Sequence, residues 1–260
     1  MRLSVIIPAL NEQTAIRAAV ESARQPGVAE VLVVDGGSRD ATVAEAAAAG
    51  ARVISASPGR GCQLNAGARA AAGDAYLFLH ADSRLPISAA SMVETLLCRP
   101  EVSAGAFRFA LDEKGWGLRL VERMVALRSR WLEFPYGDQA IFLRSETFWR
   151  VGGFPETPIM EDYELVRRLR RLGRIAIADA AVVTSARRWR RLGVWRTTLY
   201  NQLCIAAYWL RVSPERIARW RAAQYQEYRS ASSSTAPSAA IRPRSKNTAR
   251  AASLRAKSRS

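Results

Sequence analysis

Acidic and amide side chains recur where an apolar segment of this sequence gives way to a loop or a helix. These positions are Asn11 and Glu12, Asp35 with Asp40, Asp82, and the pair Glu161 and Asp162. Open α/β sheets build their binding sites at the carboxyl ends of strands. Carboxylates gathered at such an edge can accept hydrogen bonds from a nucleoside, hold a metal ion, or act as a general base. The order of these positions therefore predicts an enzyme site that binds a nucleotide-linked substrate.

The segment that starts at Asp35 has the composition of a ligand-binding turn. Asp35 follows the apolar residues 31–34, and two glycines, Ser38 and Asp40 come after it. Glycine lets a backbone approach a ligand closely, and Ser38 or Asp40 can cap the helix that follows. An ordinary glycine-rich turn with a helix cap explains the same residues, so both interpretations stay open at this point.

Two further segments carry groups suited to an anion and to a metal ion. Arg60 stands in a glycine-rich loop that enters a helix, and the N-terminus of a helix favours a diphosphate. His80 and Asp82 end an apolar run two residues apart. In an extended segment such residues face the same side, so the two side chains can point at one ion. A solvated arginine and a structural histidine are the alternatives.

Glu161 and Asp162 are the best candidates for a catalytic base. Pro158 precedes a predicted helix, and the N-terminal end of a helix favours ionised carboxylates in its first turn. Either carboxylate can then accept a proton at neutral pH. Simple capping of the helix is the alternative. Asp138, in a segment at 136–139 that can line an acceptor pocket, is a second candidate for a catalytic carboxylate.

Strands and helices that alternate in the first half of the chain position these side chains. Short apolar or β-branched runs predict strands, and alanine-rich segments between them predict helices. This alternation predicts an α/β fold with a parallel core. Strands are expected at residues 3–7, 30–34, 52–55, 75–79, 107–111, 140–143 and 175–178, and helices at 12–23, 41–49, 61–72, 117–130, 161–172 and, as a pair broken near Pro214, 199–229.

The length and the charge of the chain limit the classes of protein to consider. The chain has 260 residues, of which 49% are hydrophobic, and this suits one catalytic domain with an appendage. The formal net charge is +16, but eight basic and no acidic residues lie in 229–260. That region is rich in Ser, Ala and Arg and has no apolar periodicity. We expect a catalytic domain at residues 1–229 and a disordered basic tail at 230–260.

The cysteine spacing and the hydropathy of the sequence indicate the cellular compartment of the protein. The three cysteines, Cys62, Cys98 and Cys204, are far apart and lack a C-x-x-C spacing, which disfavours a disulfide framework and a zinc site. The first eight residues are better interpreted as a strand than as a signal peptide. No window approaches the roughly 20 apolar residues that span a bilayer. We expect a cytoplasmic protein, with peripheral contact at the inner face of a membrane as a further option.

The ordered set of motifs resembles family 2 glycosyltransferases, which have the A-type glycosyltransferase fold. The resemblance covers about residues 3–190 and is carried by the segments at 4–12, 34–40, 80–82 and 161–162. It implies a Rossmann-like, mostly parallel mixed sheet flanked by helices, with C-terminal helices beyond it. The whole chain also resembles a bacterial subgroup linked to arsenosugar biosynthesis and, more distantly, carotenoid glycosyltransferases.

The resemblance also implies an inverting, metal-dependent hexosyl transfer from a nucleotide-diphosphate sugar, with a UDP-sugar favoured, to a small-molecule or lipid acceptor. It implies Asp162 as the general base and Asp82 as the ligand of the metal and the diphosphate. His80 stands where the family usually has the first aspartate of an Asp-x-Asp motif. Imidazole suits transition metals, so Mn²⁺ is favoured over Mg²⁺ as the divalent cation. The nucleotide-sugar pocket is expected to comprise Pro8, Ala9, Asn11, Glu12, Asp35, Arg60, Asn65, Ala81, Asp82 and Arg188.

The C-terminal part of the folded region is both aromatic and basic. Arg188 and Trp189 resemble the end of the Gln-x-x-Arg-Trp signature of processive synthases, but Ser185 replaces the glutamine, so processivity does not follow. Arg188 remains a candidate for a phosphate contact. Residues 195–228 can lie on an anionic membrane if an apolar face is exposed. Packing of these helices on the core is the favoured interpretation.

Two other functional classes are alternatives to a glycosyltransferase. A nucleotidyltransferase needs a glycine-rich phosphate loop after the first strand, and Ala9-Leu10-Asn11 is not one. A basic RNA-binding protein is expected to interleave aromatic and basic residues over a folded face, whereas the densest charge here lies in the tail. Specific nucleic-acid binding is therefore not expected.

Overall fold

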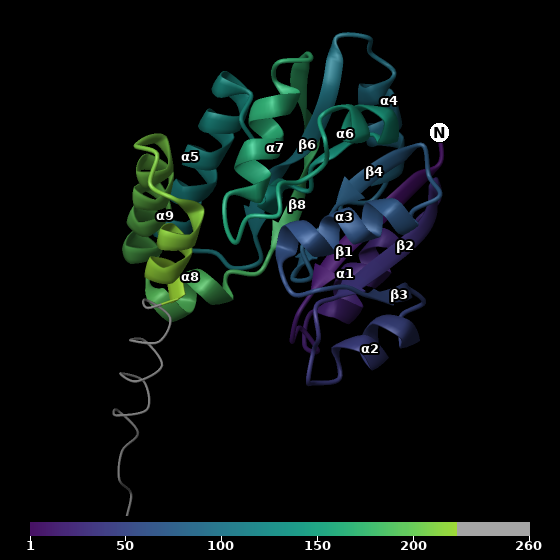
Figure 1. The fold of residues 1–260 in the computed structure, drawn as a ribbon, viewed down its shortest axis with the longest axis horizontal. Helices are drawn as coiled ribbons and strands as arrows, with labels where there is room; N and C mark the ends of the chain where they lie inside the picture. The colour runs from purple at the N-terminus through teal and green to yellow at the C-terminus, as the bar shows by residue number, and fades with distance from the viewer. Residues whose placement is uncertain (223–260) are drawn as a thin grey trace, which may run out of the picture. The chain divides into compact units, whose positions relative to one another are not determined.

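One mixed sheet of eight strands organises the fold in the computed structural model, which describes residues 1–222 (Figure 1). The strands are β1 (Leu3–Ala9), β2 (Val28–Asp35), β3 (Arg52–Ser55), β4 (Ala75–Phe78), β5 (Ser83–Arg84), β6 (Val102–Leu111), β7 (Phe142–Arg144) and β8 (Arg174–Thr184). They lie in the order β3-β2-β1-β4-β7-β6-β8-β5. The four strands β3, β2, β1 and β4 are parallel to one another, and β6 is parallel to β8. The strand β7 is antiparallel to both β4 and β6, and β5 is antiparallel to β8. The prediction of a mostly parallel mixed sheet is confirmed.

Helices cover both faces of the sheet. The helices α1 (Ile16–Ala23), α2 (Thr42–Ala48) and α4 (Ala89–Leu97) contribute to one apolar core, and α3 (Arg60–Ala70), α6 (Ser145–Arg150) and α7 (Glu161–Leu169) contribute to a second core. Successive residues of a strand face opposite sides. For this reason Val5 and Ile7 lie in the first core, and Ile6 lies in the second.

A glycine on α3 brings this helix close to the central strands. A Cβ atom on Gly67 would lie 2.4 Å from Cγ2 of Ile6 and 2.9 Å from Cγ2 of Val34. A larger residue would force the helix away from β1 and β2. Close packing at Gly67 therefore sets the position of the first residue of α3, Arg60, relative to the ends of these strands.

The remaining helices form a group at the other end of the sheet. They are α5 (Trp116–Leu132), α8 (Arg187–Leu192), α9 (Val194–Trp209) and a helical segment at 214–222. Figure 1 shows α5, α8 and α9 away from α2 and β3. In the described part of the chain, no helix has both the length and the apolar character needed to cross a bilayer. The predicted break near Pro214 is present, and the tail predicted at 230–260 lies outside the described residues.

Some predicted element boundaries were wrong. The first helix begins at Ile16 and not at residue 12, because residues 13–15 form a turn, and Asn11 just before them has a φ of 55°. The N–H of Glu12 donates to Oγ1 of Thr42 at 2.7 Å, which ties that turn to the start of α2. The helices α4, α6 and α8 were not predicted, and β6 begins five residues before the predicted strand at 107.

Candidate active site

The carboxyl ends of β1, β2 and β4 lie side by side and place several predicted residues at one edge. Pro8 and Ala9 of β1 pair in register with Val34 and Asp35 of β2. Gln63 of α3, which was not predicted, donates from Nε2 to the carbonyls of Ala9 (2.9 Å) and Val34 (2.8 Å). These two bonds fix the start of α3 against both strand ends.

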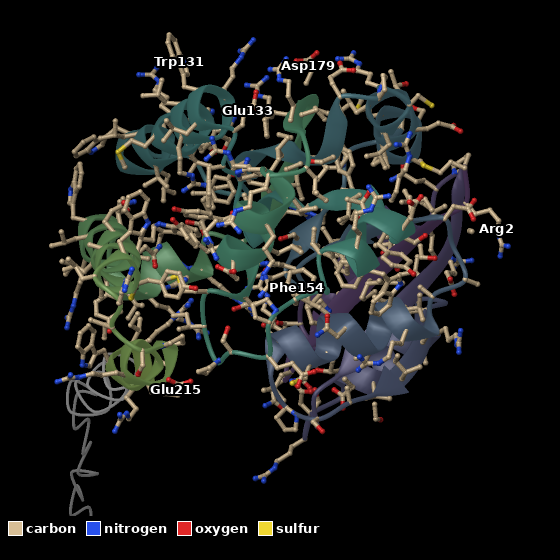
Figure 2. All side chains as sticks on the ribbon, turned by 45° about the horizontal axis from the view of Figure 1, so that its top comes forward. Arg2, Trp131, Glu133, Phe154, Asp179 and Glu215 are labelled. Atoms are coloured by element: carbon tan, nitrogen blue, oxygen red, sulfur yellow. The ribbon has the colours of Figure 1, made fainter. Side chains whose placement is uncertain are left out.

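A cavity of about 10 Å³ lies next to these strand ends. Its lining includes Pro8, Arg60, His80, Gly137 and Asp162. Of these five, all except Gly137 had been singled out individually in the sequence. Phe154 also lines the cavity and lies in the interior in Figure 2. The fold thus brings together residues that are more than 150 positions apart in the chain.

Hydrogen bonds hold the carboxylate of Asp162 in one orientation. Its Oδ2 accepts from the N–H of Gly137 at 2.7 Å, and its Oδ1 accepts from the N–H of Tyr163 at 2.7 Å. A Cβ atom on Gly137 would lie 2.5 Å from Nη2 of Arg60, 3.0 Å from Oδ2 of Asp162 and 3.2 Å from Nε2 of His80. Glycine at 137 is therefore required for this approach. The segment 136–139 was predicted to line an acceptor pocket, but this contact of Gly137 with Asp162 was not predicted.

Glu161 differs from its neighbour Asp162 in burial and in partner. It is buried, and its Oε1 lies 3.3 Å from Nε of Arg60. Burial raises the pKa of Glu161, the charge of Asp162 raises this pKa further, and Arg60 lowers it. Glu161 is thus held against Arg60, whereas Asp162 faces the cavity. This arrangement favours Asp162 over Glu161 as a group that meets a substrate.

The raised pKa of Glu161 predicts a dependence of stability on pH. The folded state binds the proton of Glu161 more tightly than the unfolded state does. The contribution of this proton to the free energy of unfolding is therefore present below the ordinary pKa of 4.5 and is lost as the pH rises through the raised pKa. Glu161→Gln cannot ionise but can still accept from Arg60. We expect the free energy of unfolding of this variant, minus that of the wild type, to increase as pH rises from 4.5 to neutrality.

Denaturant unfolding at a series of pH values measures this difference. Glu146→Gln, at an exposed position on α6, is the matched control for the same chemical change. If the difference between Glu161→Gln and the wild type did not increase with pH beyond that of the control, the assigned direction of the pKa shift would be wrong.

Arg187, the first residue of α8, joins two of the predicted carboxylates. Its guanidinium donates to the carboxylate of Glu12 and lies 3.3 Å from Oδ2 of Asp82. Burial raises the pKa of Glu12 and of Asp82, and the charge of Arg187 opposes both shifts. The sequence analysis had selected the next residue, Arg188, which donates to Oδ1 of Asn201 at 3.0 Å.

His80 and Asp82 differ in their fit to a divalent cation. The Nε2 atom of His80 faces Nη2 of Arg60, and burial together with the charge of Arg60 lowers the pKa of His80 well below its usual value. The imidazole is therefore neutral, but its ring nitrogen is directed at Arg60. Asp82 offers a partly buried carboxylate, a hard ligand that suits Mn²⁺ or Mg²⁺. Within residues 1–222, no group of three or more His, Cys, Asp or Glu side chains has the geometry to hold a metal ion.

Asp138 is a buried carboxylate with an unsatisfied oxygen. It belongs to the 3₁₀ turn Gly137–Gln139, and its Oδ1 has no hydrogen-bond partner among the described residues. Burial raises the pKa of Asp138, and the nearby charge of Asp162 adds to this effect. Asp138 is therefore ionised in a smaller fraction of molecules at a given pH than an isolated aspartate is, so less of it is available to accept a proton.

The other predicted binding residues have structural partners of their own. Asp35 accepts from the N–H groups of Gly37 (3.0 Å) and Ser38 (3.1 Å) in the predicted turn. Asn11 accepts from the N–H of Arg39 at 2.9 Å. Asn65 is buried and exchanges two hydrogen bonds with the backbone of Phe154. Ala81 is buried in the first core. The turns that hold Asn11 and Asp35 border the site, while Asn65 supports the loop that carries Phe154.

Comparison with known proteins adds independent information. Residues 4–154 match the family model for glycosyl transferase family 2. A glucosyl-3-phosphoglycerate synthase from Mycobacterium tuberculosis is 36% identical over 92 residues, which are 31% of this chain and 28% of that protein.

Two solved structures have a similar fold. The Mycobacterium tuberculosis glucosyl-3-phosphoglycerate synthase, in complex with Mn²⁺, UDP-glucose and phosphoglyceric acid, is 26% identical, with a TM-score of 0.52 over 70% of this chain and 71% of that one. S. aureus TarS, in complex with UDP-GlcNAc, is 20% identical, with a TM-score of 0.58 over 71% of this chain and 58% of that one. The match thus spans less than two thirds of TarS and about a quarter of the aligned synthase sequence.

Proposed function

The chain belongs to glycosyl transferase family 2, and we propose that it moves a sugar from a nucleotide-diphosphate donor to an acceptor hydroxyl in a single displacement that inverts the anomeric carbon. The observation that carries this proposal is the convergence of Arg60, His80 and Asp162 on one cavity beside Pro8. Such a displacement requires a fixed carboxylate that accepts the proton of the hydroxyl and a positive group that stabilises the departing diphosphate.

Asp162 is the proposed general base. Its Oδ2 is oriented by the N–H of Gly137 and can take the proton of an acceptor hydroxyl as this attacks the sugar. A positioned base contributes about 10²–10⁴-fold to the rate. The segment of Tyr136 and Asp138 next to Gly137 is the proposed acceptor side, and a small molecule or a lipid is the proposed acceptor.

Positive side chains are proposed to stabilise the departing diphosphate. Arg60 stands at the start of α3, and Arg187 stands between Glu12 and Asp82. A divalent cation, when bound, supplies Lewis-acid stabilisation of a diphosphate, and Asp82 would hold it. The related synthase was solved with Mn²⁺ and UDP-glucose, which supports Mn²⁺ and a UDP-sugar donor for this chain. We further propose that residues 1–229 form the catalytic domain and that the protein acts in the cytoplasm.

Calorimetric titration of UDP, GDP, ADP and dTDP into the purified protein tests this function. Each titration is made with Mn²⁺, with Mg²⁺ and with a chelator. We expect UDP to bind with Mn²⁺ and to bind more weakly with the chelator. Tight binding of a different nucleotide would correct the donor, and absence of binding under every condition would contradict a nucleotide-sugar site in this protein.

A further inference from the structure

An exposed apolar stripe runs along the length of α5. It consists of Trp116, Leu120, Met124, Leu127 and Trp131, which are spaced three or four residues apart and therefore share one face of the helix. The exposed fraction rises from 37% at Leu120 to 79% at Trp131. Trp131 projects outward in Figure 2. The apolar face of an amphipathic helix normally packs on a core, but this one is open to solvent.

A second exposed stripe continues the first on α9. Trp195, Leu199 and Leu203 are each four residues apart and are 57%, 62% and 56% exposed, and Trp209 and Leu210 follow at the end of the helix. The rings of Trp116 and Trp195 lie in contact, with centroids 5.7 Å apart. The two stripes therefore form one surface, which we call the α5–α9 face. Contiguous exposed apolar surface of this kind marks an interaction site.

The helical segments that form the α5–α9 face carry mostly positive side chains. The segment 116–132 contains four arginines and one glutamate, and the segment 187–222 contains nine arginines and one glutamate. The glutamate of α5, Glu122, accepts from the N–H of Leu111 and pairs with Arg119, so it adds no free negative charge. Exposed arginines on these helices include Arg119, Arg123 and Arg130. The complementary partner is therefore negatively charged and apolar.

We propose that the α5–α9 face docks on the surface of an anionic lipid bilayer. Tryptophan is the side chain that prefers the boundary between lipid and water, and the α5–α9 face carries four of them: Trp116, Trp131, Trp195 and Trp209. Arginine side chains extend to lipid phosphates while their stems stay in apolar surroundings. A second copy of the chain fits less well, because its own face would bring arginines against arginines.

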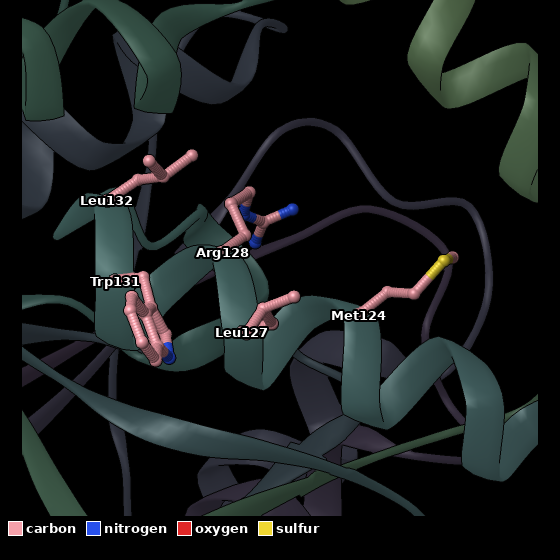
Figure 3. A pocket seen from close by; sticks show the side chains of 5 residues that line it. All are labelled: Met124, Leu127, Arg128, Trp131 and Leu132. Carbon is pink, nitrogen blue, oxygen red and sulfur yellow. The ribbon is translucent and has the colours of Figure 1, made fainter.

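The docking face also adjoins the candidate active site. An open hollow of about 460 Å³ on α5 is lined by Met124, Leu127, Arg128, Trp131 and Leu132 (Figure 3). Arg128 reaches from this hollow to the site: its guanidinium lies 3.5 Å from the centre of the Tyr136 ring, and it donates to Oε1 of Gln139 at 3.1 Å. A bilayer against the face would thus lie beside the turn that holds Gly137 and Asp138. Docking itself does not depend on the proposed sugar transfer.

Co-sedimentation with vesicles tests the proposal. The full chain is mixed with vesicles of phosphatidylcholine alone or of phosphatidylcholine with phosphatidylglycerol. We expect binding to the anionic vesicles, and we expect the variant Leu127→Ala/Trp131→Ala to bind them about tenfold more weakly. Alanine preserves the helix. The control is Ile87→Ala, which removes a 91% exposed side chain before α4 and should bind like the wild type. Every variant retains residues 223–260, so their basic charge is constant.

Quenching of tryptophan fluorescence by brominated lipids locates the contact. Trp131→Phe keeps an apolar ring, so this variant should still bind, but it should show less quenching than the wild type. If Leu127→Ala/Trp131→Ala bound like the wild type and Trp131→Phe left quenching unchanged, the proposal would be overturned. It would also be overturned if light scattering showed a stable dimer that the double variant dissolved while vesicles bound neither protein.

Discussion

Asp162→Asn is expected to reduce sugar transfer by about 10²–10⁴-fold while leaving donor binding close to that of the wild type. The asparagine oxygen can still accept from the N–H of Gly137, the bond that measures 2.7 Å for Asp162. The loop and the cavity are therefore retained. What is lost is a carboxylate able to take the proton of the acceptor hydroxyl. Initial rates with a UDP-sugar, together with calorimetry of UDP, measure the two quantities separately.

Three comparison variants sharpen this test. Asp179→Asn changes an exposed aspartate on β8 that projects from the surface in Figure 2, and should leave the rate unchanged. Glu161→Gln and Asp138→Asn change the other two candidate carboxylates. A larger loss of turnover in one of these two than in Asp162→Asn would assign the general base to that residue. Full activity of Asp162→Asn would exclude Asp162 as the general base.

Asp82→Asn is expected to weaken UDP binding in Mn²⁺ by about tenfold or more, since one interaction with a charged group contributes about 1.5–3 kcal/mol. In the presence of a chelator, the variant and the wild type should bind UDP with similar affinities. The substitution removes the proposed cation ligand but keeps the size of the side chain. Arg187 retains its bond to Glu12, so α8 stays in place.

A second ion pair of α8 provides the matched control for Asp82. Glu113 pairs with Arg190 on the same helix but on an exposed surface. Glu113→Gln should leave UDP affinity unchanged in both conditions, because exposed ion pairs contribute little. An equal loss of affinity with Mn²⁺ and with chelator in Asp82→Asn would show that Asp82 contacts the nucleotide without a cation.

The strands and the residues at their ends could be predicted from the sequence because both depend on local composition. A run such as Val31 to Val34 forms a buried strand wherever a parallel core is available, and its end then lies beside those of its neighbours. His80 was selected from such a local signal, Asp162 from a local signal together with the family resemblance, and Pro8 from the resemblance alone; all three line the cavity. Membership of the glycosyltransferase family confirms the predicted fold and enzyme class.

Contacts between distant segments could not be predicted in the same way. The bond between Gly137 and Asp162 depends on where the turn at 137–139 meets α7, which no local rule determines. The choice between Arg187 and Arg188 depends on the direction in which α8 leaves the sheet, and Glu12 is 175 positions from Arg187. Asn65 was predicted to lie in the nucleotide-sugar pocket, and its hydrogen bond to the carbonyl of Phe154, a residue 89 positions away that lines the cavity, could not be predicted.

The position of Arg187 has a consequence for experiments with the metal-free protein. Glu12 and Asp82 come from loops of different strands, and their mutual repulsion is balanced by a guanidinium that the chain itself provides. Arg187 thus offsets the repulsion between Glu12 and Asp82, and no added cation is needed to keep these two carboxylates together. We therefore expect chelation to change ligand affinity without unfolding the protein, so protein prepared in this way can serve as the reference state for a metal titration.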